Sequence, residues 1–166
     1  MKDGSFYIAG AADANVYAMD MTSTEQAQIG THEKPVSSVR VVDVPGCNGP
    51  IVASGSWDKT VKFWDVRQSA ETPATTLTCK ERVYSIDTNS KNKDAETKLL
   101  FIATAQQHIH IVDLRNPTEF LDTRDSTIDM QTTVIRAMPD GAGFGVATVG
   151  GKCAYTYLDD SKRYPL

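Results

Sequence analysis

The stretch that decides the fold is residues 54–67, Ser-Gly-Ser-Trp-Asp-Lys-Thr-Val-Lys-Phe-Trp-Asp-Val-Arg. Its second half alternates polar residues with β-branched or aromatic ones, which predicts a β-strand, and Asp58-Lys59 predicts a turn before it. Similar short alternating runs follow one another along the chain, separated by clusters rich in Gly, Pro, Asn and Asp. The sequence therefore predicts an all-β architecture.

Parts of this stretch recur along the chain. Residues 10–20, 55–65 and 103–113 align without gaps, and residues 147–157 match more loosely. The closing positions 20, 65, 113 and 157 are separated by 45, 48 and 44 residues. A period near 45 with four strands in each unit is typical of β-propeller blades, each of which must stack on a neighbour to bury its apolar faces. We expect the units at approximately residues 5–31, 32–79, 80–126 and 130–160.

The composition excludes several classes of protein. The chain has 166 residues, of which 40% are hydrophobic and 23% charged, with a net charge of −4. That apolar fraction can form a core, and the acidic charge gives no general attraction to nucleic acid or anionic membranes. No apolar run reaches the roughly 18–20 residues of a membrane-spanning helix. The three widely spaced cysteines indicate a reducing, intracellular compartment rather than a disulfide framework or zinc site. We expect no cofactor, no metal and no membrane insertion.

The run at residues 54–67 resembles WD-repeat β-propellers and, more narrowly, the nuclear-pore mRNA-export factor family. The likeness extends over four further segments, residues 30–36, 81–87, 103–118 and 150–159. A spindle-checkpoint paralogue of that family is also similar, notably at residues 131–139. Because members have seven blades, the resemblance implies about half a propeller. We expect an open, partial WD-repeat β-propeller of about four blades, with two antiparallel four-stranded blades flanked by two of three strands.

The resemblance assigns a structural role to four polar residues of the second unit: His32, Ser54, Asp58 and Trp64. In WD-repeat proteins the His bridges the Asp and the Ser, and the Ser accepts a hydrogen bond from the Trp indole. A Ser/His/Asp set also suggests a hydrolase. However, Ser54 lies in the middle of a predicted strand rather than on a G-x-S-x-G elbow. We therefore expect a structural tetrad, present in this unit alone, and no enzymatic activity.

Propellers mostly bind partners on the rim where the turns between second and third strands meet the start of each first strand. Alignment of the repeats places seven residues on that rim: Pro35, Ser37, Trp57, Arg82, Tyr84, Thr133 and Ile135. Trp, Tyr and Arg are the residue types enriched in interaction hot spots. Ordinary rim packing for Trp57 and an intra-blade ion pair for Arg82 are the alternatives. The resemblance implies the partner, a helical GLEBS segment of a large nucleoporin or a checkpoint kinase.

Three further features allow other interpretations. His108 and His110 alternate on one predicted strand and could ligate a metal, but no third ligand lies nearby, so we expect both to face solvent. Trp64-Asp-Val-Arg67 fits the W-D-x-R pattern by which some WD-repeat proteins dock on cullin-ligase adaptors, with Arg67 on the opposite rim. RNA contact is attributed to the export family, but the scattered lysines here favour an indirect or weak contact.

These features predict a non-enzymatic docking scaffold without a small-molecule substrate. The first hypothesis is support of poly(A) RNA export through a GLEBS-containing nucleoporin, which would place the chain in the nucleus, at the nuclear pore or envelope, with the cytoplasm as a second location. The second hypothesis is a kinetochore scaffold of the spindle checkpoint. The third is a substrate receptor of a cullin-type ubiquitin ligase.

Overall fold

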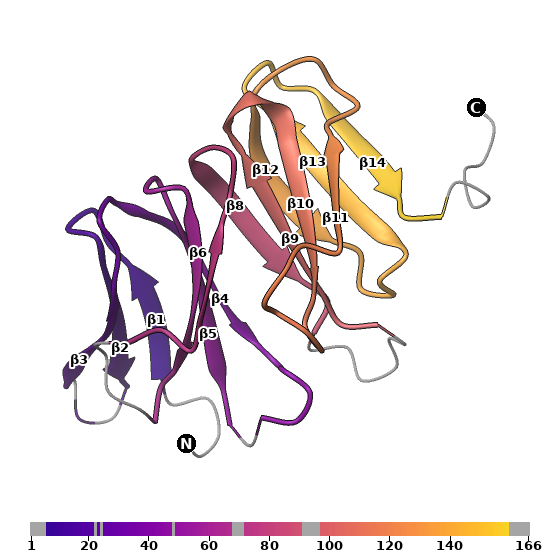
Figure 1. The fold of residues 1–166 in the computed structure, drawn as a ribbon. Coiled ribbons are helices and arrows are strands. Elements are labelled where there is room, and N and C mark those ends of the chain that lie inside the picture. Colours follow the sequence, from indigo (N-terminus) through magenta and orange to yellow (C-terminus); the bar gives the residue numbers. More distant parts are fainter. Residues whose placement is uncertain are drawn as a thin grey trace.

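The part of the chain that the structure describes forms fourteen β-strands in four antiparallel sheets, and the sheets follow one another in chain order (Figure 1). The computed structural model describes residues 6–21, 23, 25–47, 49–67, 72–90 and 97–159. Within these ranges the one helical element is a 3-10 turn at Ala105–Gln107, and no helix could span a membrane. The predicted all-β class is confirmed. The unit ends expected at residues 5 and 160 lie outside the described residues.

Each sheet is a meander of consecutive strands. The first contains β1 (Phe6–Gly10), β2 (Asn15–Asp20) and β3 (Gln26–Thr31). The second contains β4 (Val36–Val42), β5 (Ile51–Ser56), β6 (Thr60–Asp65) and β7 (Thr75–Thr78). The third contains β8 (Val83–Thr88), β9 (Leu99–Thr104), β10 (His108–Asp113) and β11 (Asp122–Asp125). The fourth contains β12 (Thr132–Ala137), β13 (Gly143–Thr148) and β14 (Cys153–Tyr157).

The sheets stack side by side into an open arc, with the first and fourth sheets at its two ends (Figure 1). Strands β4, β8 and β12 are the first strands of their sheets and lie next to one another. By its repeat position, β1 matches β5 rather than β4, so the first sheet has no counterpart of β4 among the described residues. The fourth sheet likewise has no counterpart of β7 there. Two four-stranded sheets are thus flanked by two of three strands, which is about half a propeller.

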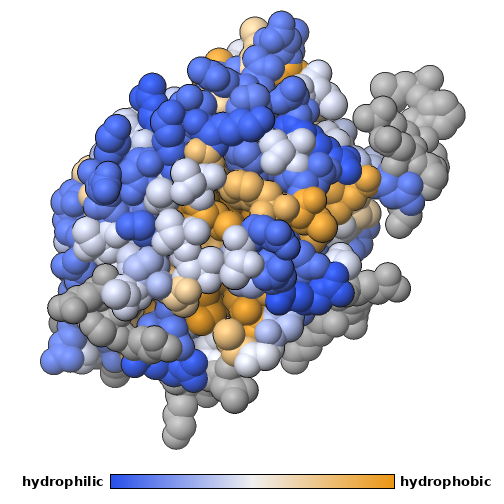
Figure 2. All heavy atoms as spheres, viewed as in Figure 1, coloured by the Kyte–Doolittle hydropathy of each residue, from blue (hydrophilic) through white to orange (hydrophobic). Residues whose placement is uncertain are grey.

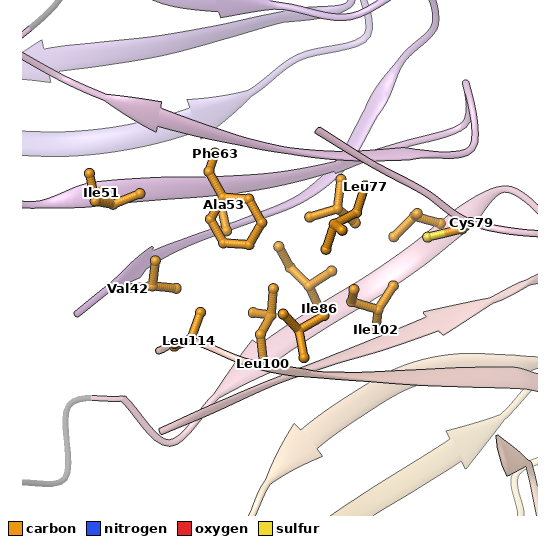
Figure 3. Packing of buried hydrophobic residues seen from close by; sticks show 13 residues of the cluster. Val42, Ile51, Ala53, Phe63, Leu77, Cys79, Ile86, Leu100, Ile102 and Leu114 are labelled. Atoms are coloured by element: carbon orange, nitrogen blue, oxygen red, sulfur yellow. The ribbon is translucent and has the colours of Figure 1, made fainter. Parts of the chain in front are cut away.

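Three apolar clusters hold the arc together, one between each pair of neighbouring sheets. In the central cluster, Phe63 and Ala53 of the second sheet face Ile86, Leu100 and other residues of the third (Figure 3). Full burial of one such Leu, Ile or Phe side chain contributes roughly 1.5–3 kcal/mol. On the surface shown in Figure 2, apolar residues gather in the middle and hydrophilic residues surround them. Stability therefore depends on the stacking of successive sheets.

The turn before the third strand of each unit has a residue in the left-handed region at the same repeat position, and in the third unit the preceding Gln106, with φ of 58°, lies there too. The residues at the shared position are Ala14, Lys59, Gln107 and Gly151, with φ of 70°, 71°, 69° and 74°. Only the last is a glycine, although this conformation costs other residues on the order of 1 kcal/mol. The shared geometry shows that the four turns are structural equivalents despite their different sequences.

The inner strands β4, β8 and β12 each carry a β-bulge at the second residue. The bulged residues are Ser37, Tyr84 and Thr133, which have no cross-strand partner in the register. A bulge changes which face the following side chains occupy. It therefore determines which residues of each inner strand turn toward the interior of the arc and which toward the apolar clusters.

Candidate functional site

The polar tetrad of the second sheet forms a continuous hydrogen-bonded chain. Trp64 Nε1–H donates to Ser54 Oγ at 2.8 Å. Ser54 Oγ lies 2.7 Å from His32 Nε2, and His32 Nδ1 lies 2.9 Å from Asp58 Oδ2. A proton on Nδ1, donated to the carboxylate, leaves Nε2 as an acceptor for the Ser54 hydroxyl, so each contact has a donor and an acceptor. The network joins β5, β6 and their turn to the segment that enters from the first sheet.

Asp58 is the anchor of this network. Its Oδ1 accepts hydrogen bonds from the Thr60 hydroxyl at 2.6 Å and the Thr60 N–H at 2.8 Å, and its Oδ2 also accepts from the Glu33 N–H at 3.1 Å. Although burial raises the pKa of Asp58, the hydrogen bonds from Thr60, Glu33 and His32 outweigh it and hold the pKa below its ordinary value. Thr60 is a fifth member that the sequence reasoning missed; its position two residues after an Asp in a turn is the signal for it.

The tetrad lies in the interior of the fold. Ser54 is fully buried, and Trp64 and His32 are buried with it. Burial also lowers the pKa of His32 below its ordinary value, against the opposing effect of Asp58. Gly30 of β3 lies against the Trp64 ring, where a Cβ would come within 2.5 Å of an indole carbon. The network thus contributes to the contact between the first and second sheets.

The other sheets lack the residues of the network: at the Ser54 and Trp64 positions the fourth sheet carries Val146 and Thr156. At the Ser54 and Trp64 positions, the third sheet carries Ile102 and Val112, which are both fully buried in the central cluster. In the first sheet, Ala9 and Met19 occupy these positions and are exposed. Only the second sheet therefore has the complete tetrad among the described residues.

Trp57 and Tyr84 meet on the rim at the start of the inner strands. Trp57 follows β5 and is 40% exposed, and its ring centroid lies 6.4 Å from that of Tyr84 on the neighbouring sheet, at an interplanar angle of 58°. The Trp57 N–H donates to the Pro35 carbonyl at 3.0 Å, which holds the turn against the start of β4. An exposed Trp beside a Tyr, on a rigid strand end, forms an aromatic surface suited to binding a partner.

Arg82 is exposed and precedes Tyr84 by two residues, immediately before β8. The ion pair in this area is instead Lys59–Glu81, at 3.1 Å, and among the described residues no carboxylate pairs with Arg82. We define the rim surface as Trp57, Arg82 and Tyr84. It offers apolar area and one uncompensated positive charge side by side.

Three other predicted rim residues, Ser37, Thr133 and Pro35, form hydrogen bonds within the chain. Ser37 is exposed, but its hydroxyl donates to the Val83 carbonyl at 2.7 Å, and the Gly55 carbonyl lies 3.1 Å from the same oxygen. Thr133 is half-buried and its hydroxyl donates to the Ala147 carbonyl at 3.1 Å. Pro35 is half-buried, and its carbonyl accepts hydrogen bonds from the Trp57 N–H and the Ser56 hydroxyl. The polar groups of these three residues are therefore used within the chain and stabilise the rim.

The prediction that Ile135 lies on the rim is wrong. Ile135 is fully buried in the cluster between the third and fourth sheets, while its neighbour Val134 is 37% exposed. The cause is the bulge at Thr133, which turns Val134 to the interior of the arc and Ile135 to the core. The bulges show that Gln131, not Thr133, matches Pro35 and Arg82, and that Thr133 matches Ser37 and Tyr84. With that alignment, Ile135 would not have been predicted on the rim.

The expectation that both histidines of β10 face solvent is also wrong for one of them. His108 is partly exposed and its Nδ1 lies 2.7 Å from Asp125 Oδ1. His110 is buried, stacked on Phe120 with centroids 4.4 Å apart, and its Nδ1 lies 2.8 Å from Thr123 Oγ1. Burial lowers the pKa of His110 to about 4. No group of three or more His, Cys, Asp or Glu in the described part of the chain could hold a metal ion.

Arg67 lies at the opposite end of β6 from Trp57, as the resemblance implies. It is exposed, and its Nε and Nη2 donate to Asp65 Oδ1 and Oδ2 at 2.9 and 2.7 Å. Arg115 and Asp113 form the same pair after β10. The repetition indicates that the Asp-x-Arg pair caps the end of the third strand. This structural role accounts for the presence of Arg67.

Comparison with known proteins agrees with the architecture. The family model described as "WD domain, G-beta repeat" matches residues 23–65. The computationally designed Ika4 protein has a similar structure, with a TM-score of 0.71 at 18% identity, covering 95% of this chain and 88% of that one. The fold is thus a partial β-propeller, and one stretch of it matches the WD-repeat model.

Named relatives place the chain more closely. It is 37% identical to the WD40 repeat protein poxJ of Penicillium oxalicum and 35% identical to the mRNA export factor GLE2 of Chaetomium thermophilum, covering 96% and 98% of this chain. It is 34% identical to the mitotic checkpoint protein BUB3.1 of Arabidopsis thaliana, over 91% of this chain. The chain is a homologue of these mRNA export and mitotic checkpoint proteins, and it spans 42–44% of their lengths.

Proposed function

We propose that the chain is a non-enzymatic docking scaffold that binds a helical GLEBS segment of a nucleoporin and supports poly(A) RNA export at the nuclear pore. One observation carries this proposal: the exposed Trp57 packs against Tyr84 on the next sheet, two residues after the exposed Arg82. Two of the similar proteins are named as RNA export factors, GLE2 and the poly(A)+ RNA export protein of Schizosaccharomyces pombe. Their names support the export role over a general scaffold.

The rim surface suits an amphipathic helix that carries both apolar and acidic side chains. Apolar residues on one helix face would cover the two rings, and a carboxylate would pair with the Arg82 guanidinium. Because Trp57 and Tyr84 come from different sheets, the helix would lie across the junction of the second and third sheets. The surface is already formed in the free chain, which limits the ordering cost to the peptide.

Calorimetric titration with a synthetic nucleoporin GLEBS peptide tests the proposal. We expect Trp57→Ala to weaken binding by roughly 2 kcal/mol or more, because truncation of a central aromatic anchor has that effect, and Arg82→Ala to weaken it further. Arg115→Ala is the matched control, since it removes an exposed arginine that already pairs with Asp113 at the end of β10. Thermal unfolding of each variant reports whether the fold is retained. Equal affinity of the Trp57→Ala, Arg82→Ala double variant and the unaltered chain would refute the assignment.

A checkpoint scaffold is the second candidate, favoured by the 34% identity to a mitotic checkpoint protein. It would use the same rim surface with a GLEBS segment from a checkpoint protein. Competition between the nucleoporin peptide and a checkpoint peptide separates the two roles, because the tighter binder identifies the partner. The ligase-receptor alternative lacks such support, because Arg67 already donates to Asp65.

A further inference from the structure

A polar cavity of about 380 Å³ lies on the interior side of the inner strands. The bulged residues Ser37, Tyr84 and Thr133 line it near the rim, and Arg40 and Arg136 line it further along β4 and β12. A volume of this size is ordinary for a small-molecule site. No carboxylate is among the lining residues, although the chain as a whole has a net charge of −4.

The two arginines flank Asp87 of β8, which compensates only one of them. Arg40 Nε donates to Asp87 Oδ1 at 2.7 Å, and the Ala137 N–H occupies Asp87 Oδ2 at 2.9 Å. Arg136 Nη1 donates to the carbonyl of its own neighbour Ile135 at 2.7 Å. Arg136 is exposed, and no carboxylate pairs with it among the described residues. The cavity therefore holds one net positive charge on a guanidinium that is free to bind an anion.

Hydroxyl groups of the same cavity add hydrogen-bond donors. Ser85 Oγ accepts a hydrogen bond from the Ile135 N–H at 3.3 Å, and no protein acceptor takes its hydroxyl proton among the described residues. The Tyr84 hydroxyl likewise has no hydrogen-bond partner there. Arg40 donates through Nε to Asp87 and through Nη1 to the Val39 carbonyl, so its Nη2 remains as a further donor. The lining thus combines two guanidinium groups with two hydroxyl donors and no side-chain carboxylate acceptor.

We propose that this inner cavity binds a small molecule that carries at least two phosphate groups. Guanidinium groups bind phosphate oxygens through paired, charge-assisted hydrogen bonds, and arginine suits this geometry better than lysine does. Arg136 takes one phosphate group, and Arg40, held in place by Asp87, takes a second together with the Ser85 and Tyr84 hydroxyls. The site uses neither Trp57 nor Arg82, and it shares only Tyr84 with the rim surface: the cavity would use the Tyr84 hydroxyl, and peptide binding would use its ring.

Titration calorimetry at constant ionic strength tests this inference with inorganic pyrophosphate and inositol hexakisphosphate as probes. We expect saturable one-to-one binding of at least one probe, weakened roughly tenfold or more by Arg136→Gln, because glutamine cannot form a charge-assisted hydrogen bond with a phosphate. Arg115→Gln, with the same change of charge on an arginine paired to Asp113, is the matched control and should bind as the unaltered chain does. The probe that binds more tightly distinguishes a linear diphosphate from a ring-borne polyphosphate.

Two outcomes would overturn the inference. One is the absence of binding by either probe at millimolar concentration. The other is an equal loss of affinity in Arg136→Gln and Arg115→Gln, which would show non-specific attraction to surface cations. Arg136 makes its hydrogen bond to its own strand, so the variant should fold, and an unchanged unfolding midpoint verifies this. Tyr84→Phe is a second variant that removes one donor and keeps the ring.

Discussion

The indole N–H of Trp64 donates to Ser54 Oγ at 2.8 Å, and both residues are almost fully buried. Ser54 is in turn 2.7 Å from His32 Nε2, so the Trp N–H completes a chain that reaches Asp58. Such buried networks stabilise a fold only when every member has its partner. The contact therefore offers a direct test of how much the tetrad contributes.

Trp64→Phe should lower the free energy of unfolding by roughly 1–3 kcal/mol beyond the loss of buried area, because Ser54 loses its donor in a dry environment. Trp57→Phe, the same exchange on the exposed rim, is the control and should change stability far less. Urea unfolding measures both. Equal denaturant midpoints for Trp64→Phe and the unaltered chain would contradict a stabilising tetrad.

The stability of the chain should fall as the pH decreases from about 6.5 to about 4. The pKa of His110 is lowered to about 4 in the folded chain from an ordinary value of 6.5, so in this window the unfolded chain binds a proton that the folded chain does not. The full shift corresponds to a loss on the order of 3 kcal/mol. His32, whose pKa is also lowered by burial, acts in the same direction.

His110→Gln separates the two histidines. We expect urea unfolding of this variant near pH 7 and near pH 5 to show a smaller difference than in the unaltered chain, because the titrating ring is gone. His108→Gln, on the same strand but partly exposed, is the matched control. An identical pH dependence in His110→Gln and the unaltered chain would exclude His110 as its source.

Ala14→Gly should stabilise the chain by about 0.5–1 kcal/mol. Ala14 has a φ of 70°, a conformation that glycine adopts without strain. The reverse exchange at the equivalent turn, Gly151→Ala at φ 74°, should destabilise by a similar amount, although a Cβ there would meet no neighbour. Thermal unfolding of the pair measures both effects, and shifts of the same sign would argue against the equivalence of the two turns.

The isolated 166-residue chain should associate in solution. Tyr7 on the first sheet and Tyr155 on the fourth are 61% and 76% exposed, and each lies on an outer sheet of the arc. Uncovered apolar sheet faces favour self-association, and a net charge of −4 is too small to oppose it. Light scattering at tens of micromolar should detect dimers or larger species, fewer in Tyr155→Lys. A sharp monomer peak with cooperative unfolding would show this expectation to be wrong.

The sequence by itself determined the strands, the repeat and the residues of the tetrad. These features are local or periodic: alternation defines a strand, turn residues separate strands, and the spacing of Ser54, Asp58 and Trp64 follows from one hairpin. His32 was assigned to the tetrad through the resemblance to WD-repeat proteins. Alignment of the repeats placed Trp57 and Tyr84 on one rim.

Only the tertiary structure decided which side chains turn inward. The bulge at Thr133 depends on pairing between β12 and β13, so no alternation rule could show that Ile135 is buried and Val134 exposed. His110 is buried because Phe120 stacks on it from a connection outside the repeated motif. The Arg40–Asp87 pair joins residues 47 apart in sequence, on neighbouring sheets whose inner strands share no backbone ladder. Such contacts depend on the packing of sheet against sheet, which is a property of the assembled arc.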